Sequence, residues 1–282
     1  MVTGASGFTG QHLCALATKS GYDVVSLKSD LMDRSSLLEE FIQVKPDFIV
    51  HLAAISFVGS QDKSSFYSVN VVGTTNLLDA ILELPKTPHK VLLASSANVY
   101  GNCEISPISE NTQPSPVNHY AAGKLTMEQM SLNYTNKIPI IITRPFNYTG
   151  LGQHVNFVIP KLVNHFLEKK PSISLGNIYV EREFNDVQMV CDLYLKLLKL
   201  GSANEIYNVC TGITYSVENI IDLLTKLTGH SIKVELAPEF IRKYEVQRLC
   251  GNPTKIRELL EQNHEVLPKI LLEETLKDML SR

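Results

Sequence analysis

The feature that most constrains the fold is a glycine-rich segment at the start of the chain, Gly4-Ala-Ser-Gly7-Phe-Thr-Gly10. It lies between the strand-like residues Met1-Val2-Thr3 and a helical pattern over Thr9–Ser20. Glycines at this spacing allow a tight turn, close approach of the backbone to a pyrophosphate, and close packing of the helix on the strand. The string alone is weak evidence, but at the first strand-to-helix junction of a βαβ pattern it predicts a dinucleotide site.

Short apolar segments alternate with amphipathic ones as far as Pro145. Strands are expected at Asp23–Leu27, Asp47–Leu52, Lys90–Ser95 and Ile138–Thr143. Helices are expected at Thr9–Ser20, Arg34–Val44, Ser60–Leu84 and Val117–Asn136. The strands are rich in Val, Ile and Leu on both faces, which is typical of a buried parallel sheet. The alternation therefore predicts an α/β fold with a Rossmann-type, doubly wound parallel sheet.

After Pro145 the alternation is less regular, and we expect a smaller C-terminal α/β lobe. Helices are predicted at Val155–Lys169, Val187–Leu200, Val217–Thr228 and Lys255–Glu261. A pair of strands is predicted around Ile173–Val180, and single strands near Ile206–Val209 and Ile232–Leu236. The proline-containing segment Ser106–Asn118 is expected to be a loop. We divide the chain into a cofactor-binding domain (1–147) and a substrate lobe (148–282), with some segments of the lobe free to return to the first domain.

Composition excludes several classes of function. The chain has 282 residues and a formal net charge of −3, so it lacks the basic surface that nucleic-acid binding requires. No apolar segment reaches the roughly 18 residues of a membrane span, and the first residues do not resemble a signal peptide. The five cysteines are scattered without a CxxC motif, which indicates reduced thiols in the cytoplasm and no metal site.

The strand before the glycine loop is unusually short. Only three residues precede Gly4, whereas a buried strand usually has about five. We therefore expect one of two situations: either the native chain begins earlier, or the first strand is short and makes weak sheet contacts.

The segment after the second predicted strand bears on the choice of cofactor. A carboxylate at that strand end accepts the ribose hydroxyls and repels a 2′-phosphate. This chain has Lys28 there, which could pair with a 2′-phosphate, so NADP(H) is favoured while NAD(H) stays open. The alternative is that Lys28 is only a solvated strand-end residue. Asp30 and Leu31 are expected to lie against the adenine.

Tyr120 and Lys124 form a candidate proton-transfer pair, since a spacing of four places them on one face of a helix. An isolated Tyr has a pKa near 10, and a nearby ammonium should lower that pKa and allow proton exchange during hydride transfer. The fourth predicted strand ends at Ser95-Ser96, and ligands of open α/β sheets lie at such strand ends. Ser96 is therefore expected to bind a substrate oxygen; the alternative is a strand-end cap.

Taken together, the ordered motifs resemble those of the extended short-chain dehydrogenases/reductases that act on nucleotide sugars. The matching segments are Gly4–Gly10, His51-Leu-Ala-Ala54, Asn70-Val-Val-Gly-Thr-Thr-Asn76, Ser95-Ser-Ala-Asn-Val-Tyr-Gly101, Tyr120-Ala-Ala-Gly-Lys124 and Arg144-Pro-Phe-Asn147. The resemblance covers essentially the whole chain. It implies an NAD(P)-dependent enzyme with the catalytic triad Ser96, Tyr120 and Lys124, and a nucleoside diphosphate sugar bound by the C-terminal lobe.

The resemblance also implies a set of binding residues and a homodimer formed through the helices at Ser60–Leu84 and around Tyr120. The implied cofactor-binding residues are Gly4, Ser6, Gly7, Phe8, Thr9, Gly10, Lys28, Asp30, Leu31, Leu52, Ala53, Ala54, Asn70, Tyr120 and Lys124. His51 is assigned no catalytic role, because a histidine at a strand end is more often structural. The chain departs from the family pattern in its short first strand and at Gly123, where a larger residue is usual.

Residues after Ser96 separate the reactions of the family. Members that eliminate water, the 4,6-dehydratases, resemble a pattern with carboxylates after the catalytic Ser or Thr. Here Ala97 and Asn98 stand in those places, and neither exchanges a proton at neutral pH. Dehydration is therefore disfavoured, which leaves ketone reduction or 4-epimerisation.

The second half of the chain resembles the GDP-6-deoxy-4-keto-D-mannose reductase (GDP-rhamnose synthase) group. The matching segments are Arg144–Gln153, Phe157–Lys161, Leu175–Asn177, Arg182–Val187, Tyr207–Gly212 and Arg242–Lys255, with Glu183 where Asp is common. We therefore expect NAD(P)H-dependent reduction of the 4-keto group of a GDP-linked 4-keto-6-deoxy sugar. The alternatives are a 4-epimerase with tightly bound NAD, a 4,6-dehydratase, and a scaffold that kept the fold without the chemistry.

Six residues are expected to contact the substrate: Ser96, Asn98, Asn147, Lys161, Arg182 and Arg242. The two arginines are candidates for the diphosphate, because a guanidinium group can bind phosphate oxygens bidentately. The alternative for each arginine is a surface or ion-pair role, and Lys161 is the weaker candidate.

Overall fold

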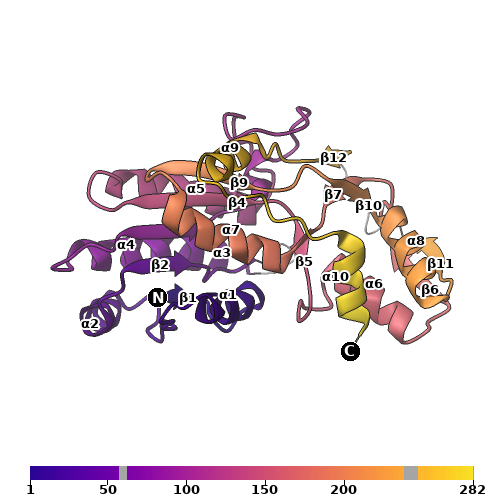
Figure 1. Cartoon of the computed structure of the whole chain (residues 1–282), viewed down its shortest axis with the longest axis horizontal. Coiled ribbons are helices and arrows are strands. Elements are labelled where there is room, and N and C mark those ends of the chain that lie inside the picture. Colours follow the sequence, from indigo (N-terminus) through magenta and orange to yellow (C-terminus); the bar gives the residue numbers. More distant parts are fainter. Residues whose placement is uncertain (57–61, 238–246, 282) are drawn as a thin grey trace.

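The computed structural model of the protein describes residues 1–56, 62–237 and 247–281 (Figure 1). A five-stranded sheet, all of whose pairings are parallel, forms the main body. In spatial order its strands are β1 (Val2–Thr3), β2 (Phe48–His51), β3 (Lys90–Ala94), β4 (Ile140–Pro145) and β9 (Glu205–Val209). Because the strands are parallel, the carboxyl ends of all five meet at one edge of the sheet.

Both faces of the sheet are covered, as expected for strands that are apolar throughout. Leu92 and Ile141 pack with the helices α1 (Phe8–Lys19), α7 (Val187–Leu200) and α9 (Thr254–Gln262) on one face. Their neighbours along the strands, Val91 and Ile142, pack on the other face with α2 (Arg34–Val44), α4 (Thr74–Leu82) and α5 (His119–Ser131). The prediction of a Rossmann-type, doubly wound α/β fold is confirmed.

The prediction of a full strand at Asp23–Leu27 was wrong. Only a bridge between Val2 and Ser26 forms, with hydrogen bonds from Val2 N to Val25 O (2.8 Å) and from Leu27 N to Val2 O (2.9 Å). The physical reason is the length of β1, because a two-residue strand gives its neighbour almost no ladder to pair with.

The helical segment before the third strand of the sheet is also less regular than expected. Of the predicted helix Ser60–Leu84, residues 60–61 lie outside the described residues. The described part runs from α3 (Ser65–Tyr67) through a π-helical turn, η1 (Ser68–Gly73), into α4. Single π-helical turns within helices often occur at functional sites. This one carries the residues Asn70 to Gly73 of the family motif.

The smaller lobe lies beside the sheet (Figure 1). Its core is formed by α6 (Val158–Leu167), α8 (Val217–Thr228) and α10 (Leu272–Leu280), the last of which the sequence analysis did not predict. β6 (Ser172–Leu175) pairs with β11 (Lys233–Leu236), whereas β7 (Glu181–Glu183) lies between β10 (Thr214–Ser216) and β12 (Arg248–Leu249). Two strands therefore do occur around the predicted segment Ile173–Val180, although the second begins at Glu181 and each pairs with a strand distant in sequence.

Several segments after residue 147 belong to the main body. β9 extends the central sheet, and α7 and α9 cover one of its faces. Short strands β5 (Tyr148–Thr149) and β8 (Asn185–Asp186) pair where the chain passes between the body and the lobe. The functional division at residue 147 stays a prediction.

Within the described residues, no helix has both the length and the apolar character that a membrane span requires. The same part of the chain contains no cluster of His, Cys, Asp or Glu side chains arranged to hold a metal ion.

A buried histidine joins the carboxyl ends of β1 and β2. Thr3 Oγ1 lies 2.8 Å from His51 Nδ1, and Thr74 Oγ1 lies 2.9 Å from His51 Nε2. Since Thr74 donates its proton to Asn70 O and Thr3 accepts from Ala53 N, the bonds are all satisfied when His51 is neutral and carries its proton on Nε2. Burial lowers the pKa of His51 to about 3, with Lys124 as the second cause.

This histidine predicts a pH-dependent stability. Below pH 6.5 the unfolded chain takes up a proton at His51, whereas the folded chain does so only near pH 3. The folded state should therefore lose about 1.3 kcal/mol between neutral pH and pH 5.5 from this group alone. Urea unfolding of the wild type and of His51→Gln, at neutral pH and at pH 5.5, measures this loss of stability. The stability difference between the two proteins should shrink at pH 5.5, and an unchanged difference would contradict the prediction.

Candidate active site

The glycine loop brings three backbone segments into direct contact at the edge of the sheet. Gly4 has a φ of +66°, and a Cβ atom there would lie 2.7 Å from the backbone nitrogen of Ala53. A Cβ at Gly10 would lie 2.2 Å from Gly4 O. Glycine at both positions therefore lets α1 and the segment after β2 approach the loop as closely as they do.

The residues present fit the pyrophosphate of a dinucleotide. α1 begins directly after Gly7, and its first turn has no side-chain cap among the described residues. The N–H groups at this helix start can bind an anion. Phe8 stacks on Tyr148 with ring centroids 6.1 Å apart, and Thr9 Oγ1 lies 2.8 Å from the Tyr148 hydroxyl. Tyr148 therefore lies beside the glycine loop, a position that the sequence analysis did not assign.

At the other end of the predicted cofactor site, Lys28 and Asp30 are exposed and Leu31 is buried. Glu40 on α2 accepts hydrogen bonds from Lys28 N (3.0 Å) and from Ser29 N (2.8 Å). Glu40 thus places a carboxylate beside Lys28 and Ser29. In the sequence itself, no carboxylate directly follows the segment Asp23–Leu27. The spacing between residues 28 and 40 gave no signal for it.

The side chain of Asn70 is hydrogen-bonded to the backbone of the loop after β2. Its Oδ1 accepts from Ile55 N (2.9 Å), and its Nδ2 donates to Ile55 O (3.2 Å). The side chain is buried, and these two bonds fix the chain just after Leu52, Ala53 and Ala54. The structure therefore places Asn70 behind the predicted cofactor residues, where it holds their backbone.

The structure brings Ser96 and Tyr120 together. Ser96 follows β3 and caps the short 3₁₀ turn η2 (Ala97–Tyr100), while Tyr120 and Lys124 occupy consecutive turns of α5. Asn118 starts that helix by accepting from Ala121 N at 2.9 Å. Tyr120 is buried, and Ser96 is close enough to influence its pKa.

The hydroxyl of Ser96 has a defined direction. Asn98 donates to Ser96 Oγ twice, from its backbone N–H at 3.2 Å and from Nδ2 at 3.1 Å. A serine oxygen has two lone pairs and one proton, so the remaining bond of Ser96 is a donated one. Ser96 is thus arranged to donate a hydrogen bond to an oxygen.

The direction of the Tyr120 pKa differs from the expectation. Burial raises the pKa of Tyr120 to about 12, and the neighbouring Ser96 hydroxyl opposes that rise. Lys124, also buried, donates to Ala94 O at 2.6 Å, and burial lowers its pKa to about 8. The spacing of Tyr120 and Lys124 predicted a lowered tyrosine pKa. The prediction was in the wrong direction because spacing contains no information about how deeply the phenol is buried.

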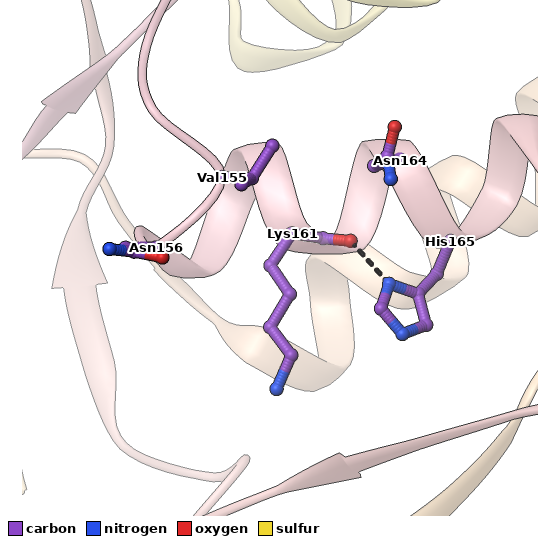
Figure 2. Close-up of a pocket in the computed structure, with 5 residues that line it drawn as sticks. All are labelled: Val155, Asn156, Lys161, Asn164 and His165. Atoms are coloured by element: carbon purple, nitrogen blue, oxygen red, sulfur yellow. Dashed lines mark hydrogen bonds between the residues drawn. The ribbon is translucent and has the colours of Figure 1, made fainter.

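The remaining expected substrate residues lie in different parts of the chain. Asn147 is exposed at the end of the Arg-Pro-Phe-Asn motif. Lys161 lines a pocket of about 440 Å³ with Val155, Asn156, Asn164 and His165 (Figure 2), and its Nζ donates to Ser174 O at 3.0 Å. Arg182 on β7 donates to Glu181 O at 2.8 Å, and Arg242 lies outside the described residues.

Comparison with known proteins decides the family. Residues 1–210 match the pattern of the NAD dependent epimerase/dehydratase family. The chain belongs to this family. The prediction of an extended short-chain dehydrogenase/reductase that uses a cofactor of the NAD(P) type is thereby confirmed.

Two relatives match over nearly their whole length. GDP-6-deoxy-D-talose 4-dehydrogenase of Aggregatibacter actinomycetemcomitans is 38% identical over 99% of this chain and 97% of its own. GDP-6-deoxy-D-mannose reductase of Pseudomonas aeruginosa is 32% identical over 100% and 97%. Among solved structures, RMD from Pseudomonas aeruginosa complexed with NADPH has a TM-score of 0.90 and 31% identity, and the match covers 99% of this chain and 96% of that one.

The structure explains why Gly123 departs from the family pattern. A Cβ at this position would lie 2.8 Å from Phe66 O, so α5 and α3 approach each other closely between Tyr120 and Lys124. Gly123→Ala should therefore push the two helices apart and displace Tyr120. We expect kcat to fall by about tenfold or more with KM for cofactor changed less, because misplacing a reacting group costs rate before binding. Gly229→Ala, at a helix end with open space, is the control for a general effect of glycine loss; equal losses in both variants would contradict the explanation.

Proposed function

We propose that the protein reduces the 4-keto group of a GDP-linked 4-keto-6-deoxy sugar with NAD(P)H. The observation that carries the proposal is the donating hydroxyl of Ser96 beside a protonated Tyr120, with Ala97 and Asn98 in the places where a dehydratase needs carboxylates. The two relatives named above support it, since both names specify a GDP-linked 6-deoxy sugar, and one of them is a reductase.

The proposed mechanism uses each member of the triad once. The bound dihydronicotinamide supplies the hydride that adds to C4. Ser96 donates a hydrogen bond to the carbonyl oxygen, where negative charge develops. Tyr120 gives its phenolic proton to that oxygen. Lys124, charged below a pKa of about 8, stabilises the phenolate that remains.

The pocket beneath α6 is proposed as part of the nucleotide subsite (Figure 2). It combines a lysine with amide and imidazole side chains, which offer both donors and acceptors for a polar, anionic ligand. Arg182 is proposed to lie on the diphosphate, with Arg242 as its partner from the residues not described.

The two relatives leave the configuration at C4 open. 6-Deoxy-D-talose and 6-deoxy-D-mannose differ only at this carbon, so their formation from a common 4-keto sugar requires hydride delivery to opposite faces of one carbonyl. NMR of the purified product distinguishes the two outcomes. Either product agrees with the proposed reduction.

A 4-epimerase is the second candidate and makes an opposite prediction for the cofactor. It oxidises and then reduces the same carbon, so it should retain NAD through purification and consume none. The proposed reductase should bind NAD(P)H reversibly and consume it in a 1:1 ratio with substrate.

The proposal predicts oxidation of NAD(P)H by the purified protein with a GDP-linked 4-keto-6-deoxy sugar. Tyr120→Phe should lower kcat by about 10²–10⁴-fold with cofactor binding largely kept, because general acid assistance has that magnitude. Absorbance at the wavelength of NAD(P)H measures the rate, with dTDP- and UDP-linked 4-keto-6-deoxy sugars as specificity controls. Near-full turnover by Tyr120→Phe, or no oxidation with any of the three substrates, would exclude the proposal.

A homodimer is proposed through the surface that η1 and α5 form at the side of the sheet. Val72, Met130 and Leu132 are apolar but 39–51% exposed there. Val72→Glu/Met130→Glu should shift the protein from dimer to monomer in sedimentation equilibrium. Val266→Glu, which changes a valine that is 74% exposed elsewhere, should leave the mass unchanged. A monomeric wild type would contradict this assembly. A cytoplasmic location likewise stays a prediction.

A further inference from the structure

A buried ion pair lies directly behind the predicted triad. Glu128 and Arg144 are 1% and 2% exposed. The carboxylate accepts two hydrogen bonds from the guanidinium, at 2.6 Å from Nη2 and at 3.0 Å from Nε, and a third from the hydroxyl of Ser95. The proposed mechanism assigns neither residue a role, although both charges were brought out of water at considerable cost.

The pair joins the two elements that carry the triad, the end of β3 and α5, to β4. Glu128 is one helical turn after Lys124 on α5, so Tyr120, Lys124 and Glu128 lie on one side of that helix. Ser95, which donates to Glu128, immediately precedes Ser96 at the end of β3. Arg144 is in β4 and so fixes the carboxylate from the far side.

Arg144 also holds the other end of the Ser96 segment. Its guanidinium lies over the ring of Tyr100, 4.9 Å from the centroid, and Tyr100 ends the short turn that starts after Ser96. The Tyr100 hydroxyl donates to Asn208 Oδ1 at 2.7 Å, which ties this turn to β9. Ser96 is therefore held on both sides, through Ser95 by Glu128 and through Tyr100 by Arg144.

Besides holding Ser96 in position, the pair bears on the charge of Lys124. Lys124 is buried, and its ammonium donates to a neutral carbonyl, that of Ala94. Burial disfavours the ammonium, whereas the negative charge of Glu128 favours it. Arg144 completes the arrangement because two hydrogen bonds from its guanidinium hold the carboxylate in place.

We propose that Glu128, held by Arg144, is a positioning residue for the triad: it sets Ser96 against α5 and places a negative charge one helical turn from Lys124. This inference rests on the proposed function for its kinetic consequences but not for its electrostatic ones. The two parts can therefore be tested separately.

The electrostatic part is tested without substrate. Lysine labelled with ¹³C at Cε gives a signal for Lys124, identified by its absence in Lys124→Arg, whose shift reports the titration. In Glu128→Gln the midpoint should fall by about one pH unit or more, because removal of a nearby charge in a buried site has that effect. Glu183→Gln is the matched control: Glu183 is also 1% exposed and multiply hydrogen-bonded, but lies in the lobe, so this variant should lose stability and leave the midpoint unchanged.

Glu128→Gln leaves Arg144 unpaired and could fail to fold. The double variant Glu128→Gln/Arg144→Gln removes both charges of the pair, so that neither member is left buried without the other, and it too should show a lowered midpoint. An unchanged midpoint in whichever of these variants folds would overturn the electrostatic part of the proposal.

The effect of Glu128 on the position of Ser96 is tested by enzyme kinetics. At a pH where Lys124 is charged in both proteins, Glu128→Gln should lower kcat by about tenfold or more and change the Kd for NADPH by less than threefold, since a misplaced Ser96 affects the reaction more than binding. Unchanged kcat would overturn this part. If the wild type itself oxidises no NAD(P)H, the proposed function fails, while the titration still decides the role of Glu128.

Discussion

The structure depends on backbone contact at the carboxyl edge of the parallel sheet. At Gly4 the loop after β1 touches the segment after β2, and at Gly10 the helix α1 touches the loop. Side chains at these positions would fill the space, so the edge could not close and the helix start could not face a phosphate. Every other functional feature is arranged from this edge: Ala53 lies against Gly4, Ser96 follows the next strand along, and Arg144 lies in the strand after that.

The sequence predicts best those elements whose signals are local. The helices Val187–Leu200 and Val217–Thr228 were predicted residue for residue, because each has an apolar face and a polar cap, Asp186 and Ser216. Strands were predicted less well where their pairing depends on distant partners. The segment Asp23–Leu27 has the composition of a strand but meets only the two residues of β1. α10 was missed although its apolar residues follow helical spacing, since its burial depends on α6 and α8.

The same distinction holds at the candidate site. Ser96, Tyr120 and Lys124 are recognisable because each lies in a short motif. Glu40, Tyr148 and the pair of Glu128 with Arg144 have partners on other elements, so no spacing rule identifies them. The pKa of Tyr120 was predicted in the wrong direction for a related reason, since desolvation by the folded chain is the largest cause of its shift and raises the pKa.

The raised pKa of Tyr120 bears on whether this residue acts as an acid or as a base in the proposed reaction. A phenol with a raised pKa holds its proton until an acceptor of sufficient basicity forms beside it, and the alkoxide produced by hydride addition to a ketone is such an acceptor. In the proposed mechanism, burial thus keeps Tyr120 protonated until the alkoxide forms. A residue that must first remove a proton needs a lowered pKa instead. Once the proton has left, the phenolate is a buried anion and needs a cation nearby. In the proposed mechanism Lys124 supplies that cation only while it stays protonated, and the proposed role of Glu128, one turn further along α5, would therefore reach a tyrosine that Glu128 does not touch.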